Sequence, residues 1–469
     1  MEGSQNPQPG SLNHPLRVAI VGSGPAGFYT AEQLLRAQGR PIEIDLFERF
    51  PTPFGLVRFG VAPDHQKIKR VSAAFERILN LARFRFLGNV NVGTDISAEE
   101  LRRHYDQVVF AYGSATDRRM GIEGEDLAGS HPATAFVGWY NGHPDFVSER
   151  FDLSTERVVV VGMGNVAMDV TRVLIRSPDE LADTDITPYA LSALRKSRVR
   201  EVVLLGRRGP AQAAFDHGEI KDIAELAGVD VLVDRDQALA AAADTTGLDA
   251  GARKNVQYLA ELAERGVTGA ARRVVLRFLA APAALAGEDG RVHAIKVEHT
   301  ELTRRDDGSV GARGTGRYEV IQTGLVLRSI GYHGTALGGV PFDERAGIIP
   351  NMLGRVTEGK GGPVLPGVYA VGWIKRGPTG LIGTNKSDAK ETADRILEDA
   401  STLAVEPSPE RSAEAVDALL ASRGVRVVMV ADWRKIDALE LASGKELGKA
   451  REKLCSIEAM LAACRAANS

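Results

Sequence analysis

The stretch LRVAIVGSGPAGFYTAEQLLRAQG, residues 16–39, decides the fold of this chain. It opens with a mainly apolar run, Leu16 to Val21, of the kind that forms a buried strand in a parallel sheet. A glycine-rich turn follows at once, and then a helical segment that Gly39 closes. The order of strand, glycine turn and helix predicts a Rossmann-like unit.

The glycines of this turn have the spacing of a nucleotide site. Gly22, Gly24 and Gly27 form G-x-G-x-x-G, in which the first glycine allows the tight turn and the second lets the backbone approach a pyrophosphate. The next strand, residues 42–49, carries Glu48 at its end, where a carboxylate can accept hydrogen bonds from a ribose diol. A purely structural turn is the alternative, but strand, spacing, helix and terminal acid together favour a dinucleotide.

The same scheme restarts later in the chain. ERVVVVGMGNVAMDVTRVLI, residues 156–175, again gives strand, glycine turn and helix. Gly162, Gly164 and Ala167 form the G-x-G-x-x-A variant of the motif, with Asn165 inside it. The sequence therefore predicts an α/β protein with two Rossmann-like dinucleotide-binding domains.

The strand after this second turn ends differently from its counterpart. VVLLGRRGPAQ, residues 202–212, places Arg207 and Arg208 where the first unit has Glu48. An acid there favours the free 2′-hydroxyl of NAD, whereas arginine accommodates a 2′-phosphate through paired charge-assisted hydrogen bonds. Most arginine pairs are merely solvated turns, but the glycine turn upstream favours NADPH here and FAD in the first unit.

Composition excludes several other classes of protein. The 469 residues carry a net charge of −3, which argues against a general affinity for nucleic acid or anionic membranes. Cys455 and Cys464 are the two cysteines, without a CxxC motif or metal-ligand spacing, so neither a redox dithiol nor a metal site is expected. No apolar run approaches the roughly 20 residues that span a bilayer. The polar start of the chain resembles no targeting peptide, so a cytoplasmic protein is expected.

The late segment YAVGWIKRGPTG, residues 369–380, is expected to return to the first domain, into which the second is then inserted. Polar stretches near 236–252 and 304–317 are expected to be surface loops. The predicted division is a disordered tail over 1–15, the first part of the FAD-binding domain over 16–115, the NADP-binding domain over 116–324, and the second part of the FAD-binding domain with a C-terminal extension over 325–469.

Long ungapped stretches of the chain resemble the adrenodoxin-reductase type of ferredoxin–NADP⁺ reductases. They are PFGLVRFGVAPDHQKIKRV (53–71), GMGNVAMDVTRVL with GRRGPAQAAF, the late run from SIGYHG through GVYAVGWIKRGPTGLIGTNKSDAKET, and DWRKIDALELASGKELGKAREK (432–453). The resemblance extends from Leu16 to the end of the chain, and such stretches are far more specific than a glycine fingerprint alone.

The resemblance implies the following cofactor-binding residues. For FAD they are Gly22, Gly24, Pro25, Ala26, Gly27, Glu48, Gly55, Leu56, Val57, Trp373, Gly380, Leu381 and Ile382. For NADPH they are Gly162, Gly164, Asn165, Val166, Arg207, Arg208 and Glu219. Trp373 is expected near the flavin or the nicotinamide, with ordinary core packing as the alternative.

Two residues are candidates for a catalytic role. His65 matches a histidine that the family has near the flavin, and we hypothesise that it relays or holds a proton together with Glu219; a structural hydrogen bond is the alternative. The loop before Glu219 departs from the family pattern, because Asp216 stands where a threonine is usual and Lys221 where an arginine is usual.

The resemblance implies hydride transfer between NADPH and N5 of FAD, followed by single-electron transfer to a ferredoxin-type iron–sulfur carrier. Ferredoxins are usually acidic, so a basic docking patch is expected; its candidates are Arg253, Lys254, Arg265, Arg272 and Arg273. The alternative is an NADPH-dependent flavin oxidoreductase with another acceptor, either a glutamate-synthase-like subunit or a monooxygenase.

Overall fold

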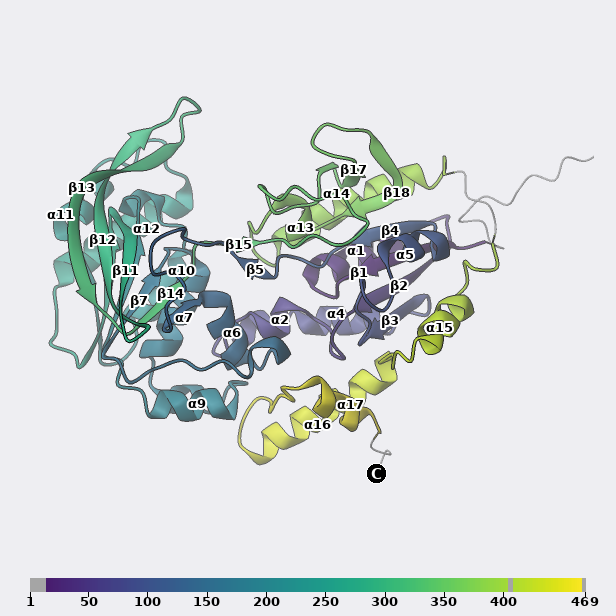
Figure 1. Cartoon of the computed structure of the whole chain (residues 1–469), viewed down its shortest axis with the longest axis horizontal. Coiled ribbons are helices and arrows are strands. Elements are labelled where there is room, and N and C mark those ends of the chain that lie inside the picture. The colour runs from purple at the N-terminus through teal and green to yellow at the C-terminus, as the bar shows by residue number, and fades with distance from the viewer. Residues whose placement is uncertain (1–13, 404–407, 466–469) are drawn as a thin grey trace, which may run out of the picture. The chain divides into compact units, whose positions relative to one another are not determined.

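The computed structural model describes residues 14–403 and 408–465, which form two compact units (Figure 1). Of the described residues, the first unit contains 14–61, 65–116, 332–403 and 408–465, and the second contains 62–64 and 117–331. The second unit is thus inserted into a first unit that is discontinuous in sequence, as predicted. Apart from its last two residues, the tail predicted over residues 1–15 lies outside the described part of the chain.

The first unit is built on a seven-stranded sheet with the order β16-β17-β18-β4-β1-β2-β3. Its strands are β1 (Leu16–Val21), β2 (Ile42–Glu48), β3 (Phe84–Gly88), β4 (Gln107–Phe110), β16 (Asn351–Met352), β17 (Arg355–Thr357) and β18 (Val364–Ala370). Its helices are α1 (Pro25–Leu35), α2 (Leu56–Phe59), α3 (Gln66–Lys69), α4 (Ser72–Leu79), α5 (Ala98–His104), α13 (Trp373–Arg376), α14 (Thr384–Asp399), α15 (Ala413–Ser422), α16 (Val430–Glu446) and α17 (Ile457–Arg465).

Both faces of this sheet are covered, which is why β1 is apolar along nearly its whole length. Val18 and Ile20 pack with residues of α1, α4, α14, α16 and α17, while Ala19 and Val21 pack with residues of α5 and α15. Figure 1 shows α1 and α14 side by side. The late helix α14 therefore belongs to the same layer as the first helix of the chain.

The second unit has a six-stranded sheet of order β6-β14-β7-β8-β10-β9 and a three-stranded sheet of order β11-β12-β13. Its strands are β6 (Ser130–Pro132), β7 (Arg157–Val161), β8 (Glu201–Gly206), β9 (Val229–Val233), β10 (Arg272–Phe278), β11 (Ala280–Glu288), β12 (Arg291–Arg304), β13 (Val310–Gln322) and β14 (Leu325–Arg328). Its α-helices are α6 (Ala133–Asn141), α7 (Asn165–Ile175), α8 (Pro178–Leu181), α9 (Pro188–Arg195), α10 (His217–Ala224), α11 (Arg235–Ala243) and α12 (Ala250–Arg265).

The two faces of the larger sheet have different partners. Val158 and Val160 of β7 pack with residues of α6, α7, α9, α10 and α12. Val159 and Val161 face the other way and pack with residues of β11, β12 and β13. The three-stranded sheet thus replaces helices on one side of the second unit.

Three expectations differ from the structure. The boundary expected between residues 324 and 325 lies between 331 and 332, because β14 pairs in parallel with β7 and β6 in the sheet of the second unit. The stretch 304–317 is the end of the hairpin of β12 and β13, with residues 305–309 between the two strands, and the polar side chains within the strands reflect an antiparallel sheet with one exposed face. The stretch 236–252 contains most of α11 and the start of α12.

Candidate functional site

The glycine turn after β1 has the geometry that its spacing predicts. Gly22 adopts φ +109°, and a Cβ on it would lie 2.6 Å from the carbonyl oxygen of Ala111. A Cβ on Gly27 would lie 2.2 Å from the carbonyl oxygen of Gly22, so only glycine lets α1 approach the strand this closely. Around Gly24, by contrast, a Cβ would meet no atom within 4 Å. The middle glycine therefore faces open space, where a phosphate can approach the backbone.

The carboxylate of Glu48 is fixed beside this turn. Its Oε2 atom accepts hydrogen bonds from the backbone N–H (3.2 Å) and the hydroxyl (2.6 Å) of Ser23. Its Oε1 atom accepts from the backbone N–H of Phe50 at 3.1 Å. The acid that was predicted to meet a ribose is therefore held next to the glycine turn.

A second turn, at Phe54 and Gly55, lies against the glycine turn. Both residues have positive φ, 86° and 48° respectively. The backbone N–H of Phe54 donates to the carbonyl oxygen of Ser23 at 3.1 Å, and a Cβ on Gly55 would lie 3.0 Å from Cα of Gly24. Leu56 is partly exposed and Val57 is buried at the start of α2. The predicted residues 55–57 and the first glycine turn thus form one local structure.

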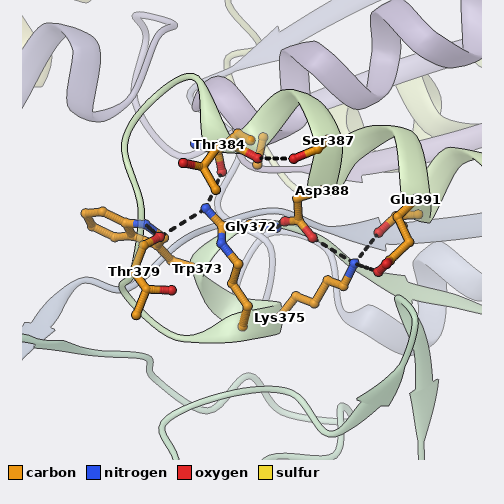
Figure 2. Close-up of polar contacts among 12 residues, drawn as sticks. Gly372, Trp373, Lys375, Thr379, Thr384, Ser387, Asp388 and Glu391 are labelled. Carbon is orange, nitrogen blue, oxygen red and sulfur yellow. Dashed lines mark hydrogen bonds and ion pairs between the residues drawn. The ribbon is translucent and has the colours of Figure 1, made fainter. Parts of the chain in front are cut away.

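The late segment returns to the same turn. A Cβ on Gly372, which has φ +77°, would lie 2.6 Å from Cβ of Ala26, so this backbone packs on the first turn of α1. Trp373 is half-buried, with its Nε1 atom donating to the carbonyl oxygen of Thr379 at 3.2 Å (Figure 2). Its ring lies 5.1 Å from that of Tyr332. The hydrogen bond of its indole N–H therefore fixes the side chain of Trp373 beside the glycine turn.

Asp388 of α14 anchors this segment, as Figure 2 shows. It accepts hydrogen bonds from the backbone N–H of Gly372 and from Arg376, both at 2.6 Å, and pairs with Lys375 at 2.7 Å. Lys375 is buried and also pairs with Glu391 at 2.6 Å. Sequence reasoning missed Asp388; its place one helical turn after Thr384 in the motif TNKSDAKET is the signal that was available.

The predicted residues 380–382 lead directly into α14. Gly380 has φ +78°, and Leu381 is 58% exposed with its backbone N–H donating to the hydroxyl of Thr384 at 3.1 Å. Ile382 is half-buried and packs against the core that contains α1. The loop therefore presents an apolar, accessible side chain at the start of the helix that lies beside α1.

The glycine turn after β7 repeats the first one. Gly162 has φ +137°, and a Cβ on it would lie 2.1 Å from the carbonyl oxygen of Ser329, while a Cβ on Gly164 would meet nothing within 4 Å. Asn165 forms a reciprocal pair with Asp216, in which its side-chain NH₂ donates to the carboxylate and its carbonyl oxygen accepts from the backbone N–H, both at 2.7 Å. The unusual Asp216 thus ties its loop to the glycine turn. Val166, half-buried, follows in the first turn of α7.

Arg207 and Arg208 follow β8 and are fixed through their backbone. The carbonyl oxygen of Arg207 accepts from the hydroxyl of Thr300 at 2.7 Å, and that of Arg208 from the N–H of Leu279 at 3.0 Å. Partial burial and repulsion from Arg207 and Arg305 lower the pKa of Arg208. No carboxylate in residues 14–403 or 408–465 forms an ion pair with Arg207 or Arg208. The cluster has surplus positive charge, as a phosphate site requires.

Arg305 is a residue that sequence reasoning missed. It lies just after β12, at the start of the turn that connects β12 to β13, and its charge acts on Arg208. The stretch around Arg305 was expected to be a surface loop, so the positive charge of Arg305 was the only available signal of a role at the phosphate site. A third guanidinium therefore adds to the positive field at the arginine pair.

Glu219 of α10 belongs to a cluster around Arg172. The guanidinium of Arg172 is 1% exposed and contacts Asp64 (2.6 Å), Asp169 (2.5 Å) and Glu219 (2.8 Å). Burial and the charges of Asp169 and Asp222 raise the pKa of Glu219 to about 7, against the opposing effect of Arg172. Arg172 was also missed by sequence reasoning, although it lies one helical turn after Asp169 in the α7 motif.

His65 precedes α3 and belongs to the first unit, whereas Glu219 belongs to the second. Their pairing through a proton therefore stays a prediction.

The five residues of the expected basic patch do not form one cluster. Arg253 and Lys254 lie in the first turn of α12, and Arg265 is its last residue, 12 positions and roughly 18 Å farther along the helix. Arg272 donates to the carbonyl oxygen of Ile175, and Arg273 pairs with the buried Glu201. Arg253 and Lys254 are thus separate from Arg272 and Arg273, whose side chains bind other residues of the second unit.

Two further observations limit the chemistry. Cys455, just before α17, and Cys464, within it, form no disulfide bond. In residues 14–403 and 408–465, none of the helices is long and apolar enough to cross a membrane.

Comparison with known proteins identifies close relatives. The family model described as pyridine nucleotide-disulphide oxidoreductase matches residues 16–234. NADPH-ferredoxin reductase FprA of Mycobacterium leprae is 45% identical, with 96% of this chain and 98% of that protein covered. The mitochondrial NADPH:adrenodoxin oxidoreductase of Arabidopsis thaliana is 41% identical, with 96% of each chain covered.

A solved structure matches equally well. Mycobacterium tuberculosis FprA in complex with NADPH superimposes with a TM-score of 0.91 at 42% identity, over 97% of this chain and all of that one. The fold and the family resemblance predicted from the sequence are thereby confirmed.

Proposed function

The chain belongs to the ferredoxin–NADP⁺ reductases of the adrenodoxin-reductase type, and from this membership we propose that it moves electrons between NADPH and a ferredoxin-type carrier. FAD is its resident cofactor. The observation that carries this proposal is the unlike ending of two matching strands. β2 ends in Glu48, held beside its glycine turn, whereas β8 leads into Arg207 and Arg208, whose charge no described carboxylate neutralises.

The first unit has the features that an FAD site needs. Open space at Gly24 leaves room for a pyrophosphate, and the anchored carboxylate of Glu48 suits a ribose diol. The turn at Gly55 and the Gly372–Trp373 segment both pack on this glycine turn, so three distant stretches of the chain converge there. We assign to this site the FAD-binding residues that the family resemblance implies.

The second unit has the features that NADPH needs. Gly164 faces open space, and because Asp216 occupies the side chain of Asn165, the backbone of Asn165 and Val166 is what remains for the pyrophosphate. Arg207 and Arg208 bind the 2′-phosphate. Glu219 of α10, which pairs with Arg172, is assigned to the nicotinamide carboxamide.

The protein itself contributes orientation and electrostatics rather than a nucleophile. Bound FAD would supply the redox chemistry, which is acceptance of a hydride from NADPH and release of its two electrons one at a time. Cys455 and Cys464 form no disulfide and lack the CxxC spacing of a redox dithiol, so an outside acceptor fits better than an internal disulfide.

His65 and Glu219 are proposed to hold or relay a proton. A carboxyl group whose pKa lies at about 7 can donate or accept a proton near neutrality. Replacing His65 by Gln should slow flavin reduction in stopped-flow experiments with little change in NADPH affinity. An unchanged rate would remove His65 from the catalytic residues.

The carrier docks, in this proposal, near Arg253 and Lys254, because these two side chains make no ion pair within the described residues. Attraction between a basic patch and an acidic ferredoxin would speed their encounter.

For location in the cell we propose the cytoplasm. Fractionation of the native host tests this, since an organellar or membrane fraction would contradict it.

The acceptor is tested by following NADPH oxidation with a panel of iron–sulfur carriers while oxygen uptake is recorded. Carrier-dependent NADPH oxidation without matching oxygen uptake supports a ferredoxin reductase. Oxygen uptake that equals NADPH consumption and depends on an organic substrate would instead indicate a monooxygenase. Reduction of neither carrier nor oxygen would favour a subunit of a larger enzyme, such as a glutamate synthase.

A further inference from the structure

The turn at Phe54 and Gly55 is strained and needs support. Phe54 has φ +86°, a conformation that a bulky side chain rarely adopts, and such outliers persist only where their surroundings enforce them. The turn matters because it brings Gly55 within reach of Gly24, the middle glycine of the first turn. The source of its support lies in α16, nearly 380 residues later in the chain.

Trp433 of α16 packs directly on the strained residue. Its ring is 1% exposed and meets the ring of Phe54 edge-on, with centroids 5.7 Å apart at 87°. The Nε1 atom of Trp433 donates to Glu76 of α4 at 3.2 Å, which fixes the plane of the indole. The guanidinium of Arg58 lies 5.6 Å from the same ring. Trp433 therefore bridges α4 and the residues on both sides of Gly55.

Glu440, two helical turns after Trp433, holds the other end of the turn. Its carboxylate is fully buried and accepts two hydrogen bonds from Arg58 of α2, at 2.9 and 2.5 Å. Arg451 donates to it at 2.8 Å, and so does the backbone N–H of Leu454, also at 2.8 Å. Lys453 donates to the carbonyl oxygen of Arg58 at 3.1 Å. The C-terminal extension thus binds both the side chain and the backbone of Arg58.

The charge of this cluster depends on Glu440. Burial alone would favour a neutral carboxyl group, but attraction to Arg58 and Arg451 outweighs burial and lowers the pKa of Glu440. The carboxylate compensates the buried guanidinium of Arg58 and the partly exposed one of Arg451 at once. Removing it leaves Arg58 buried without its partner, which is far costlier than loss of an exposed ion pair.

We propose that Trp433 and Glu440 are positioning residues for FAD, because they hold the strained Phe54–Gly55 turn against the backbone of Gly24. The C-terminal extension is then part of the flavin site, although neither residue is expected to touch the cofactor. This inference rests on the proposed function, since it assigns the first glycine turn to FAD.

The test is the dissociation constant for FAD of the full-length Glu440→Gln variant, measured by reconstitution of the flavin-free protein. We expect it to rise roughly tenfold or more, as release of local strain of this kind would cause. The absorbance band of the bound flavin should shift toward that of free FAD. Affinity for NADP⁺, which the second unit binds, should stay within about twofold.

Asp437→Asn is the matched control, because Asp437 lies on the same helix and pairs with Arg451 at 2.6 Å without contacting Arg58. It should leave the affinity for FAD unchanged. If Glu440→Gln does not fold, Glu440→Asp keeps the charge but shortens the reach, and Trp433→Leu removes the contact with Phe54. Both should also weaken FAD binding.

Unchanged affinity for FAD in the folded variants, with only a lower melting temperature, would overturn the inference and leave a purely structural cluster. If the wild-type protein itself does not bind FAD, the proposed function fails instead, so the two failures are distinguishable.

Discussion

Arg207 and Arg208 are the residues proposed to determine which nicotinamide nucleotide the protein uses. Replacing both by Ala should raise the KM for NADPH at least tenfold, because each charge-assisted hydrogen bond to a phosphate contributes roughly 1.5–3 kcal/mol. The KM for NADH, which lacks the phosphate, should barely change. Steady-state kinetics with both nucleotides measure this, with Arg195→Ala, an exposed residue at the end of α9, as control. Equal losses with NADH and NADPH would mean that the arginines form only a turn.

Glu219 gives stability a pH dependence of defined sign. Its pKa is raised from 4.5 to about 7, so between these values the native state holds a proton that the unfolded chain has lost. The free energy of unfolding should therefore fall as pH rises from about 4.5 to about 7 and then level off with respect to this group. Glu219→Gln should flatten this decline in urea unfolding curves recorded at several pH values.

Glu225→Gln is the control for this effect, because Glu225 follows α10 directly and its side chain is 62% exposed in a weak pair with Lys221. Its pH dependence should match the wild type. If the Glu219→Gln curves run parallel to those of the wild type at every pH, the proton is not held at Glu219.

The glycine turns are the elements that the sequence predicts best, because their requirements are local. At Gly24, where φ is −77° and a Cβ would meet nothing, alanine should leave the stability of the flavin-free protein almost unchanged. The same methyl group should weaken FAD binding at least roughly tenfold, because it occupies the space through which the backbone approaches a pyrophosphate. Calorimetry of the flavin-free protein and FAD titration separate the two effects.

Gly359→Ala is the matched control, since a Cβ there also meets open space but lies in the β17–β18 connection. Tight FAD binding by Gly24→Ala would contradict the assignment of this turn.

Other elements could not be predicted for a physical reason. β14 pairs with β7 across more than 160 residues, and a short apolar strand does not reveal which sheet it joins. Arg58 and Glu440 are 382 positions apart, and Arg172 and Glu219 are 47 apart. Such partners meet only through the fold. Motif residues such as Glu48 and Arg207 could be predicted because each stands at the end of an apolar strand, and a strand end can be recognised from neighbouring residues alone.

Docking of an acidic carrier, as proposed, depends on the whole molecule, because a chain with a net charge of −3 would need a local basic face for it. Reversing the charge of Arg253 and Lys254 should slow carrier reduction at low ionic strength and have little effect at high salt. Ferricyanide reduction should be spared. Arg195→Glu, at the exposed end of α9, is the control. Equal loss with ferricyanide and the carrier would contradict docking at this end of the helix.

The most direct test of the central claim is an anaerobic titration of the flavin-loaded protein with NADPH in the presence of a purified ferredoxin. About two one-electron carriers should be reduced for each NADPH consumed, because a hydride carries two electrons. Substituting NADH, or using the variant with both Arg207 and Arg208 replaced by Ala, should greatly slow the reduction. NADPH oxidation that leaves the ferredoxin oxidised would show that a ferredoxin is not the electron acceptor.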